Sequence, residues 1–321
     1  MMKKVYIIIL NYNGWKDTIE CLESVLKTDY LNYQIVVVDN NSLDNSMEYL
    51  IKWIKGDLCL YIPNNNPLKN LSFPIENKPL NYILYTQEEA LSASPIKETD
   101  YNNPIIFIQA EQNRGFAAGN NIGIKYAFAK NDFEYIYLLN NDAVIQTDTI
   151  SKFVNYINNK TLHLLGSIQY SYYNPKSIQA IGGGFSKLQA NFWNYQTIKD
   201  IKKINYIYGA SMFFKKETLQ KVGLLNEEYF LYYEEIDYAE RLKKIKLKQE
   251  VVKFIGIYHK HSQTISKEDN DFREYFLEKN KIIFYKNYYK YLLFIPVLKS
   301  LKKYLFTFKK IYLQSIKDGL K

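Results

Sequence analysis

Short apolar runs alternate along the chain with stretches in which apolar residues recur every three or four positions. The runs VYIIIL (5–10), QIVVV (34–38) and YIYLL (135–139) are too short and too rich in β-branched or aromatic residues for helices. Runs that are apolar on both faces are typical of inner strands covered on both sides. The stretches 19–26 and 47–54 have helical spacing. This alternation predicts an α/β fold with a mostly parallel central sheet flanked by helices.

Three of the predicted strands end on polar residues. The first is followed by Asn11 and Asn13, the second ends at Asp39, and the third leads into Asn-Asn-Asp at 140–142. Ligands of open α/β proteins bind beyond the carboxyl ends of the strands, so these clusters together predict one pocket. Asn and Asp also form turns, because their side chains bond to their own backbone. A turn explains each cluster separately, but it explains the repetition less well.

A fourth strand pattern, IIFIQ (105–109), leads into Arg114 and Gly115, and a helical pattern begins at Ala117. Small residues at the start of a helix let a diphosphate approach exposed N–H groups, and Arg114 adds positive charge. Glycines are also ordinary turn formers, and neither G-x-G-x-x-G nor G-x-x-x-x-G-K-[ST] is present. The pattern therefore gives little support to a dinucleotide or P-loop site.

Acidic residues open a helix in the second half of the chain. A strand pattern at 210–214 leads to a short helix ending near Gly223, then to the aromatic turn YFLYY, and then to a helix opened by Glu234, Glu235 and Asp237. The helix dipole favours acidic residues in the first turn, which is a purely structural explanation of their position. An acid that lies beside aromatic side chains can also be held in the protonation state and the orientation that a general base requires. Placement alone leaves both explanations open.

Positive charge is concentrated in the tail. The 321-residue chain has a formal net charge of +9, and residues 272–321 hold 12 Lys or Arg against 3 Asp or Glu, so the tail carries +9 and the rest is neutral. A phosphate-tracking groove needs clustered Lys and Arg, which argues against nucleic-acid binding by the main domain. The two cysteines, Cys21 and Cys59, lack metal-ligand spacing, which favours a reduced compartment.

The tail interleaves aromatic and aliphatic residues with lysines, and Pro296 is expected to split it into two amphipathic helices. Such helices lie in the plane of anionic membranes, which predicts a peripheral membrane contact. Packing on the body or on a partner subunit is the alternative. No apolar stretch reaches the length of a membrane span. The run at 5–10 resembles a signal peptide but suits a buried strand better.

Residues 57–104 interrupt the pattern, and five of the eight prolines of the chain lie between Pro63 and Pro95. We expect this segment to be an inserted loop that can include a short hairpin of its own. The alternative is a disordered linker.

Five motifs follow one another in the order seen in the family 2 inverting glycosyltransferases: VYIIILNYNG, VVVDNNSLDNS, NRGFAAGNNIGI, YLLNND and YFLYYEEIDYAERL. The chain most resembles the rhamnosyltransferase-like bacterial branch, from residue 3 to about residue 265. This resemblance implies a GT-A fold over residues 1–265, with 57–104 as an insertion and with a helical tail at 266–321. It also implies a divalent cation, Mn²⁺ or Mg²⁺.

The resemblance assigns the polar strand ends to a nucleotide site. Asp39 resembles the residue that binds the base or ribose, and Asn11 and Asn13 would line the same pocket. The other residues implied at the nucleotide are Asn113, Arg114, Gly119 and Asn141.

The remaining motifs resemble the metal and catalytic residues of the family. Residues 140–142 resemble the D-x-D motif with Asn at the first acidic position, so Asp142 is the implied metal ligand, and His259 in IYHKHS resembles the late histidine that helps hold the metal or diphosphate. YEEID resembles E-D-x-D, whose second acid is the catalytic base. Glu235 stands at that position with Glu234 as the alternative, and Asp237 would orient the loop or contact the acceptor.

These roles predict a single displacement, with inversion, that moves a sugar from a nucleoside-diphosphate sugar to a hydroxyl of a glycan or a lipid-linked saccharide. The expected place is cytoplasmic, peripheral on the inner face of the cytoplasmic membrane, where a surface polysaccharide is built. A nucleotidyltransferase would share the metal-bearing pocket but would not predict the YEEID motif. The non-enzyme alternative is a degenerate transferase that binds glycan or scaffolds an assembly.

Overall fold

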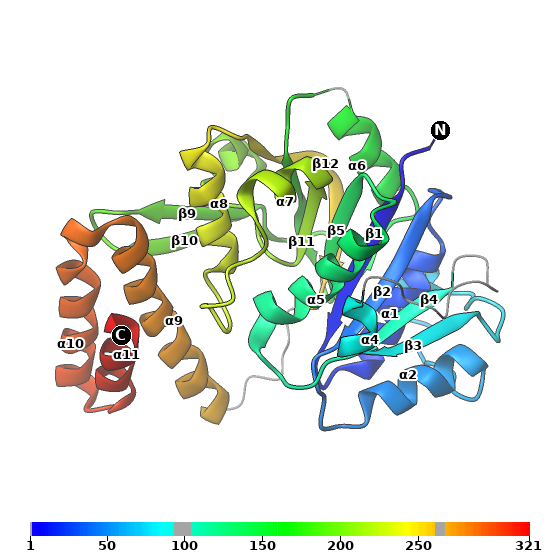
Figure 1. Ribbon diagram of the computed structural model, residues 1–321, viewed down its shortest axis with the longest axis horizontal. Helices are drawn as coiled ribbons and strands as arrows, with labels where there is room; N and C mark the ends of the chain where they lie inside the picture. Colours follow the sequence, from blue (N-terminus) through cyan, green and yellow to red (C-terminus); the bar gives the residue numbers. More distant parts are fainter. Residues whose placement is uncertain (1, 93–103, 159, 261–266) are drawn as a thin grey trace.

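A computed structural model describes residues 2–92, 104–158, 160–260 and 267–321. The described residues form a ten-stranded sheet in the order β3-β4-β2-β1-β5-β11-β7-β12-β6, with β8 paired to β7, and a separate ribbon of β9 and β10 (Figure 1). The strands are β1 (Val5–Asn11), β2 (Tyr33–Asp39), β3 (Tyr82–Thr86), β4 (Ile105–Gln109), β5 (Tyr135–Asn140), β6 (Ala143–Ile145), β7 (Leu164–Ser171), β8 (Ile178–Ala180), β9 (Gly182–Ser186), β10 (Asn191–Tyr195), β11 (Ser211–Lys215) and β12 (Gln249–His259).

Helices cover both faces of this sheet. They are α1 (Trp15–Leu26), α2 (Ser46–Lys55), α3 (Lys69–Ser72), α4 (Gln87–Leu91), α5 (Gly115–Lys130), α6 (Thr149–Asn158), α7 (Lys216–Val222), α8 (Glu234–Lys244), α9 (Lys267–Tyr288), α10 (Phe294–Thr307) and α11 (Ile311–Leu320). The predicted strands at 5–10, 34–38, 105–109, 135–139 and 210–214 are confirmed, and so are the helices that follow them.

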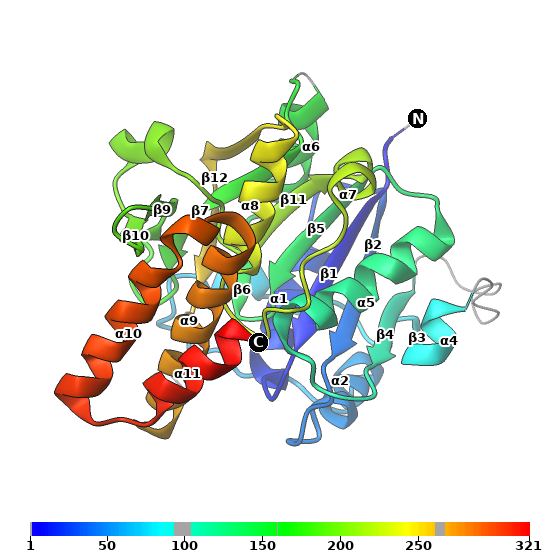
Figure 2. The ribbon, with the colours of Figure 1, turned by 60° about the vertical axis from the view of Figure 1, so that its left-hand side comes forward.

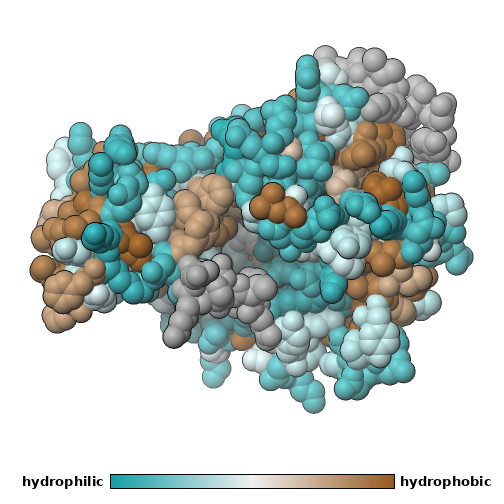
Figure 3. All heavy atoms as spheres, turned by 90° about the horizontal axis from the view of Figure 1, so that it is seen from below, coloured by the Kyte–Doolittle hydropathy of each residue, from teal (hydrophilic) through white to brown (hydrophobic). Residues whose placement is uncertain are grey.

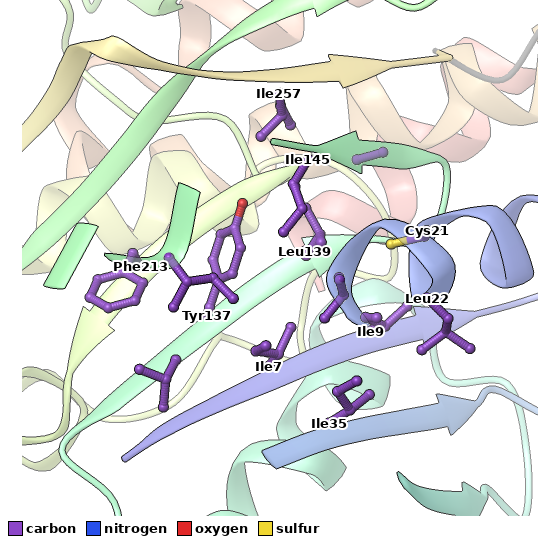
Figure 4. Close-up of a cluster of buried hydrophobic side chains, with 14 of the residues drawn as sticks. Ile7, Ile9, Cys21, Leu22, Ile35, Tyr137, Leu139, Ile145, Phe213 and Ile257 are labelled. Atoms are coloured by element: carbon purple, nitrogen blue, oxygen red, sulfur yellow. The ribbon is translucent and has the colours of Figure 1, made fainter. Parts of the chain in front are cut away.

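Side chains on the two faces of β1 belong to two different cores. Ile7 and Ile9 lie in a cluster with side chains of α1, α2 and α6, whereas Tyr6 and Ile8 lie in a cluster with side chains of α4, α5, α7 and α8. Figure 4 shows the first cluster, with Leu22 of α1 beside the β1 isoleucines. Burial on both faces explains why the strand is apolar throughout instead of alternating with polar residues.

Helix α5 lies unusually close to the sheet because two of its residues lack side chains. A Cβ atom added at Gly119 would lie 2.4 Å from the side chain of Leu10, and one added at Gly123 would lie 2.6 Å from that of Ile8. Close helix–strand packing therefore requires glycine at both positions.

The sheet is parallel from β3 to β5 and mixed beyond it. Strand β11 runs antiparallel to both β5 and β7, β12 runs parallel to β7, and β6 pairs antiparallel with β12. The register of the last pair sets His259 opposite Ala143. The end of β12 is thereby brought beside the end of β5, although more than a hundred residues separate them in the chain.

The described part of the proline-rich range 57–104 joins the main sheet. Strand β3 pairs in parallel with β4 at the edge of the sheet, so residues 82–86 do not form a hairpin of their own. Residues 93–103 lie outside the described part of the chain.

The tail forms three helices, and the prediction of two helices divided at Pro296 is wrong. Pro296 is the third residue of α10, because a proline is tolerated in the first turn of a helix, where its missing N–H has no intrahelical partner. Helix α9 packs on the body through Ile283 and Phe284, which share a cluster with Tyr229 and Tyr233. Helices α10 and α11 pack against α9 (Figure 2). None of the described helices combines the length and apolarity needed to cross a bilayer.

The proline-rich range is tied to the body by one buried carboxylate, which generates a stability prediction. Glu23 of α1 accepts hydrogen bonds from Trp53 Nε1 at 2.8 Å, from the backbone N–H of Glu76 at 2.9 Å and from Lys78 Nζ at 3.0 Å. The Glu23 and Lys78 side chains are 1% and 8% exposed. Glu23→Ala leaves the Lys78 charge buried and unpaired, so we expect it to lower the free energy of unfolding by about 3 kcal/mol.

Urea unfolding of the two proteins measures this difference. Glu48→Ala is the matched control, because it removes the exposed ion pair between Glu48 and Lys52 and should cost less than about 1 kcal/mol. Equal losses from the two variants would contradict the prediction.

Candidate active site

Polar side chains at the carboxyl edge of the parallel strands form one hydrogen-bonded network. Asp39, which is 1% exposed, accepts hydrogen bonds from Asn11 Nδ2 at 2.6 Å, from the Ser42 hydroxyl at 2.6 Å and from Gln109 Nε2 at 2.9 Å. The Ser42 hydroxyl also accepts from the backbone N–H of Asn13 at 2.9 Å. Strands β1, β2 and β4 thus converge on one buried carboxylate, whose direction is set by its donors.

The network continues toward β5 and α5. Asn141 Nδ2 donates to the Thr18 hydroxyl at 3.0 Å, and that hydroxyl donates to Asn11 Oδ1 at 2.7 Å. On the other side, Asn40 Nδ2 donates to Asn113 Oδ1 at 2.9 Å. The buried Oδ1 atom of Asn40 has no hydrogen-bond partner within the described residues. This edge therefore has an acceptor available for a ligand.

Two of the residues expected at the nucleotide have other structural tasks. Arg114 is exposed, and its Nη2 atom lies 3.1 Å from Glu227 Oε2. Gly119 is buried against Leu10, so its small size is already required by helix packing. Their contact with a nucleotide stays a prediction.

A carboxylate and an imidazole meet where β5 and β12 end. His259 Nε2 lies 3.0 Å from Asp142 Oδ1, and His259 Nδ1 lies 3.0 Å from Gln179 Oε1. Burial would raise the pKa of Asp142, but the hydrogen bond and charge of His259, together with Lys260, lower it. Asp142 is therefore a carboxylate at neutral pH, which is the form that binds metal ions.

These two residues fit a divalent cation. Both nitrogens of His259 face oxygen atoms, so the position between Nε2 and Asp142 suits either a proton or a cation. Oxygen and imidazole donors suit Mn²⁺, and Gln179 would act as the outer partner that orients the ring. Within the described residues no group of three or more His, Cys, Asp or Glu gathers as a metal site, so the protein would contribute Asp142 and His259.

Lys260 supports this pair, although the sequence patterns did not single it out. Its backbone N–H donates to the carbonyl of Asp142 at 3.0 Å, and its ammonium group contacts Asp17 at 2.6 Å and Glu20 at 2.5 Å. The contacts with two carboxylates of α1 anchor the chain directly after His259. The adjacent His261 lies outside the described residues.

Of the two glutamates that open α8, Glu234 is buried and Glu235 is half-buried, and both are poorly satisfied. Atom Oε2 of Glu234 and atom Oε2 of Glu235 are buried and have no hydrogen-bond partner in the part of the chain that the structure describes. Burial raises the pKa of Glu235 to about 7. Burial and the neighbouring charge of Glu235 raise the pKa of Glu234 well above its usual value. A carboxyl group with a pKa near neutrality suits a general base.

Asp237 differs from its two acidic neighbours. Its Oδ2 accepts from Arg241 Nε at 2.7 Å and its Oδ1 accepts from the Tyr288 hydroxyl at 2.6 Å. Asp237 is 1% exposed and is not among the residues that line the cavity described next. These contacts join α8 to the tail helix α9, which agrees with an orienting role.

One cavity of about 920 Å³ brings the predicted metal and catalytic residues together. Asp142, His259, Glu234 and Glu235 all line it. The residues predicted at the nucleotide are not among its lining residues; they are Asn11, Asn13, Asp39, Asn113, Arg114, Gly119 and Asn141. The structure therefore places the candidate chemistry in a cavity and the candidate nucleotide contacts along the adjoining sheet edge, with β5 ending between them.

Several functional candidates were not predicted. Ser42 lies inside the motif VVVDNNSLDNS, and Gln109 is the last residue of a predicted strand, so both had a sequence signal. Lys260 lies inside IYHKHS, but its contacts with Asp17 and Glu20 form only in the folded chain. Gln179 had no sequence signal, because it acts through His259, a neighbour that only the folded chain supplies.

Comparisons with known proteins identify the family of this chain. The model of the family described as "Glycosyl transferase family 2" matches residues 6–70 and 85–223, more than half of the chain. A hexosyltransferase of low-salt glycan biosynthesis, Agl10 from Haloferax volcanii, is 23% identical over 208 residues. The match covers 60% of this chain and 65% of that protein, so the chain spans less than two thirds of this relative.

Solved glycosyltransferase structures share the fold. The mannosyltransferase PcManGT from Pyrobaculum calidifontis, in complex with GDP-Man and Mn²⁺, has a TM-score of 0.53 at 14% identity, covering all of this chain and 74% of that one. GalNAc-T7 with UDP, GalNAc and Mn²⁺ has a TM-score of 0.56 at 14% identity, covering 88% of this chain and 50% of that one. These likenesses show a GT-A fold. By its fold and by the extent of the family match, this chain belongs to glycosyl transferase family 2.

Proposed function

We propose that the protein is a metal-dependent inverting glycosyltransferase that moves a hexosyl or deoxyhexosyl group from a nucleoside-diphosphate sugar to a hydroxyl of a glycan or lipid-linked saccharide. One observation carries the proposal. Glu235, which has a pKa of about 7 and a buried Oε2 atom, lines the same cavity as the Asp142 and His259 pair. A base and a leaving-group site in one cavity are what a single displacement requires.

The donor would lie across the end of β5. Its nucleoside would contact the network around Asp39, where Asn11, Asn13 and Asn113 hold fixed positions. Its diphosphate would reach Asp142 and His259, which would hold Mn²⁺ or Mg²⁺. A bound cation would neutralise the negative charge that grows on the leaving diphosphate. The sequence resemblance to the rhamnosyltransferase-like branch adds dTDP to UDP and GDP as candidate nucleotides.

The chain's own residues would perform the proton transfer. Glu235, in its ionised form, would take the proton from an acceptor hydroxyl as the oxygen attacks the anomeric carbon from the face opposite the diphosphate. One displacement inverts the configuration at that carbon. Asp237 would hold α8 in place through Arg241 and Tyr288. Neither a nucleotidyltransferase nor a glycan-binding scaffold needs such a base, and family membership favours the transferase.

The metal proposal predicts that Asp142→Ala weakens Mn²⁺-dependent binding of the preferred nucleotide more than tenfold. Calorimetric titration of dTDP, UDP and GDP, each with and without Mn²⁺, measures this. Asp57→Ala, which removes an exposed carboxylate outside the site, is the control. Wild-type binding that is independent of metal would contradict the proposal.

The base proposal predicts that Glu235→Gln lowers kcat by about 10³-fold while the nucleotide still binds. Because the base must be ionised, wild-type kcat/KM should rise about tenfold per pH unit up to a pH of about 7 and then level off. A pH profile with no rise below 7 in the wild type, or a larger loss of kcat in Glu234→Gln than in Glu235→Gln, would contradict the assignment.

The raised pKa also predicts a stability effect of the same variant. A carboxyl group whose pKa rises on folding binds more protons in the folded state, so its contribution to stability falls as the pH increases from the unfolded value toward 7. At pH 8 the ionised Glu235 destabilises the fold. The Tm of Glu235→Gln should therefore equal or exceed that of the wild type at pH 8, which separates lost chemistry from lost folding.

We also propose that the tail attaches the enzyme to the inner face of the cytoplasmic membrane. Support comes from apolar side chains at the end of α10, where Leu305, Phe306 and Phe308 are 66%, 76% and 77% exposed, and from the exposed lysines Lys309 and Lys310. Figure 3 shows apolar residues on the surface at the left-hand end, where the tail helices lie. Apolar rings flanked by lysines suit an anionic lipid surface.

This proposal predicts that the double variant Phe306→Ser/Phe308→Ser binds phosphatidylglycerol-containing vesicles at least about tenfold more weakly than the wild type. Leu188→Ser, which removes a 68% exposed apolar residue between β9 and β10, is the control. Vesicle sedimentation measures the bound fraction. Equal binding of all three proteins, or no binding of the wild type, would contradict attachment of the tail to the membrane.

A further inference from the structure

The tail helices supply one wall of the candidate active-site cavity. Arg273, Glu278 and Lys281 of α9 and Lys303 of α10 line it, together with the catalytic candidates Glu234 and Glu235. The tail is therefore part of the site and not only an appendage of the body.

This wall carries an excess of positive charge. Glu278, with a side chain 3% exposed, lies 2.9 Å from Lys281 Nζ and 2.8 Å from Lys303 Nζ, and it accepts a hydrogen bond from the Ser300 hydroxyl at 2.6 Å. Burial would raise the pKa of Glu278, but these two lysines and Ser300 hold it at about 2. A single carboxylate thus faces two ammonium groups.

Arg273 adds a third cation. It is exposed at the cavity, and no ion pair joins it to an acid within the described residues. Across the cavity, Glu235 carries part of one negative charge at neutral pH, because burial raises its pKa to about 7. This partial charge does not match the excess of positive charge on the tail wall. Three cationic side chains against one ionised acid leave the tail wall positive.

Packing of the tail does not require all of these charges. Lys281 is mostly buried and would neutralise Glu278 alone, whereas the Lys303 side chain is 48% exposed. No ion pair joins Arg273 to Glu278 in the part of the chain that the structure describes. Long cationic side chains kept at the mouth of a cavity suit an anionic ligand, and a guanidinium with two ammonium groups suits a phosphate.

The rest of this side of the cavity is aromatic and amide-rich. Phe192, Tyr206, Tyr208 and Tyr232 line it beside Asn191. Lys299 Nζ donates to Asn191 Oδ1 at 2.6 Å, so α10 also positions β10 at the cavity. Aromatic faces and amides suit a sugar ring. The cationic side chains lie on the wall of the cavity that the tail helices form.

We propose that the acceptor carries a phosphate group, which Arg273, Lys281 and Lys303 bind while a sugar hydroxyl of the same molecule lies at Glu235. This inference rests on the proposed function and names its acceptor class. The phosphate could belong to a lipid-linked saccharide or to a water-soluble phosphorylated glycan, and both have the same chemistry at this wall.

Calorimetric titration of the full chain in EDTA, which removes divalent cations, tests the proposal with three probes: dodecyl phosphate, glucose 1-phosphate and the neutral dodecyl glucoside. Arg273→Gln/Lys303→Gln is the test variant. Lys290→Gln/Lys317→Gln is the matched control, because it removes the same charge from exposed tail positions outside the cavity. We expect the test variant to bind the phosphate probes at least about tenfold more weakly, with the control and the neutral probe unchanged.

The outcomes distinguish the two sources of the phosphate, and they distinguish this inference from the proposed function. Tighter binding of dodecyl phosphate than of glucose 1-phosphate, lost in the test variant, supports a lipid-linked acceptor; equal binding supports a soluble one. Phosphate probes that bind no better than the neutral probe, or that bind the test variant as well as the wild type, overturn the inference. The single variant Arg273→Gln keeps both ion pairs of Glu278. A loss of phosphate binding in this variant is therefore not the result of a folding defect. Nucleotide binding with Mn²⁺ is measured in the same proteins, and its absence in the wild type would count against the proposed function instead.

Discussion

The contact between His259 and Asp142 depends on a strand register, and most of the site depends on that contact. Strand β12 must pair with β6 so that His259 lies opposite Ala143, the residue after Asp142. A shift of one residue would turn the imidazole to the other face of the sheet. The ion pairs of Lys260 with the partly exposed Asp17 and the buried Glu20 hold the chain at this point, and α1 thereby helps to position a residue near the end of the body.

Glu234 and Glu235 of α8 are held in a less favourable environment than Asp39 at the carboxyl edge of the parallel strands. Asp39 receives several hydrogen bonds, whereas Glu234 and Glu235 each keep a buried oxygen without a partner among the described residues. Burying a carboxyl group in this way disfavours its charged form and reduces stability. The fold offsets this cost with the well-satisfied neighbour Asp237, which joins α8 to the tail through Tyr288. A helix held firmly at one acid can expose two others to the cavity.

The tail contributes to the candidate active-site cavity. Its first helix buries Ile283 and Phe284 against the body, and its inward charges lie in the same cavity as Glu235. Its outward apolar residues, at the end of α10, are separate from that wall. One segment thus has an inner face suited to a phosphate and an outer face suited to a lipid surface.

The sequence by itself determined four of the five strands in the parallel half of the sheet, because apolar runs of strand length and the helical spacing after them are local properties. It also indicated Asp39, Asp142, Glu235 and His259 as candidates, since each lies at the end of an element or the start of one, and their roles stay predictions. The three-helix tail was not predicted, because Pro296 can begin a helix as well as divide one. Only the tertiary structure decided that Glu235 keeps a buried oxygen without a partner among the described residues while Asp237 is paired, and that Lys281 and Lys303 face Glu278 in the cavity. Burial and charge pairing depend on which distant elements pack together, and no local pattern contains that information.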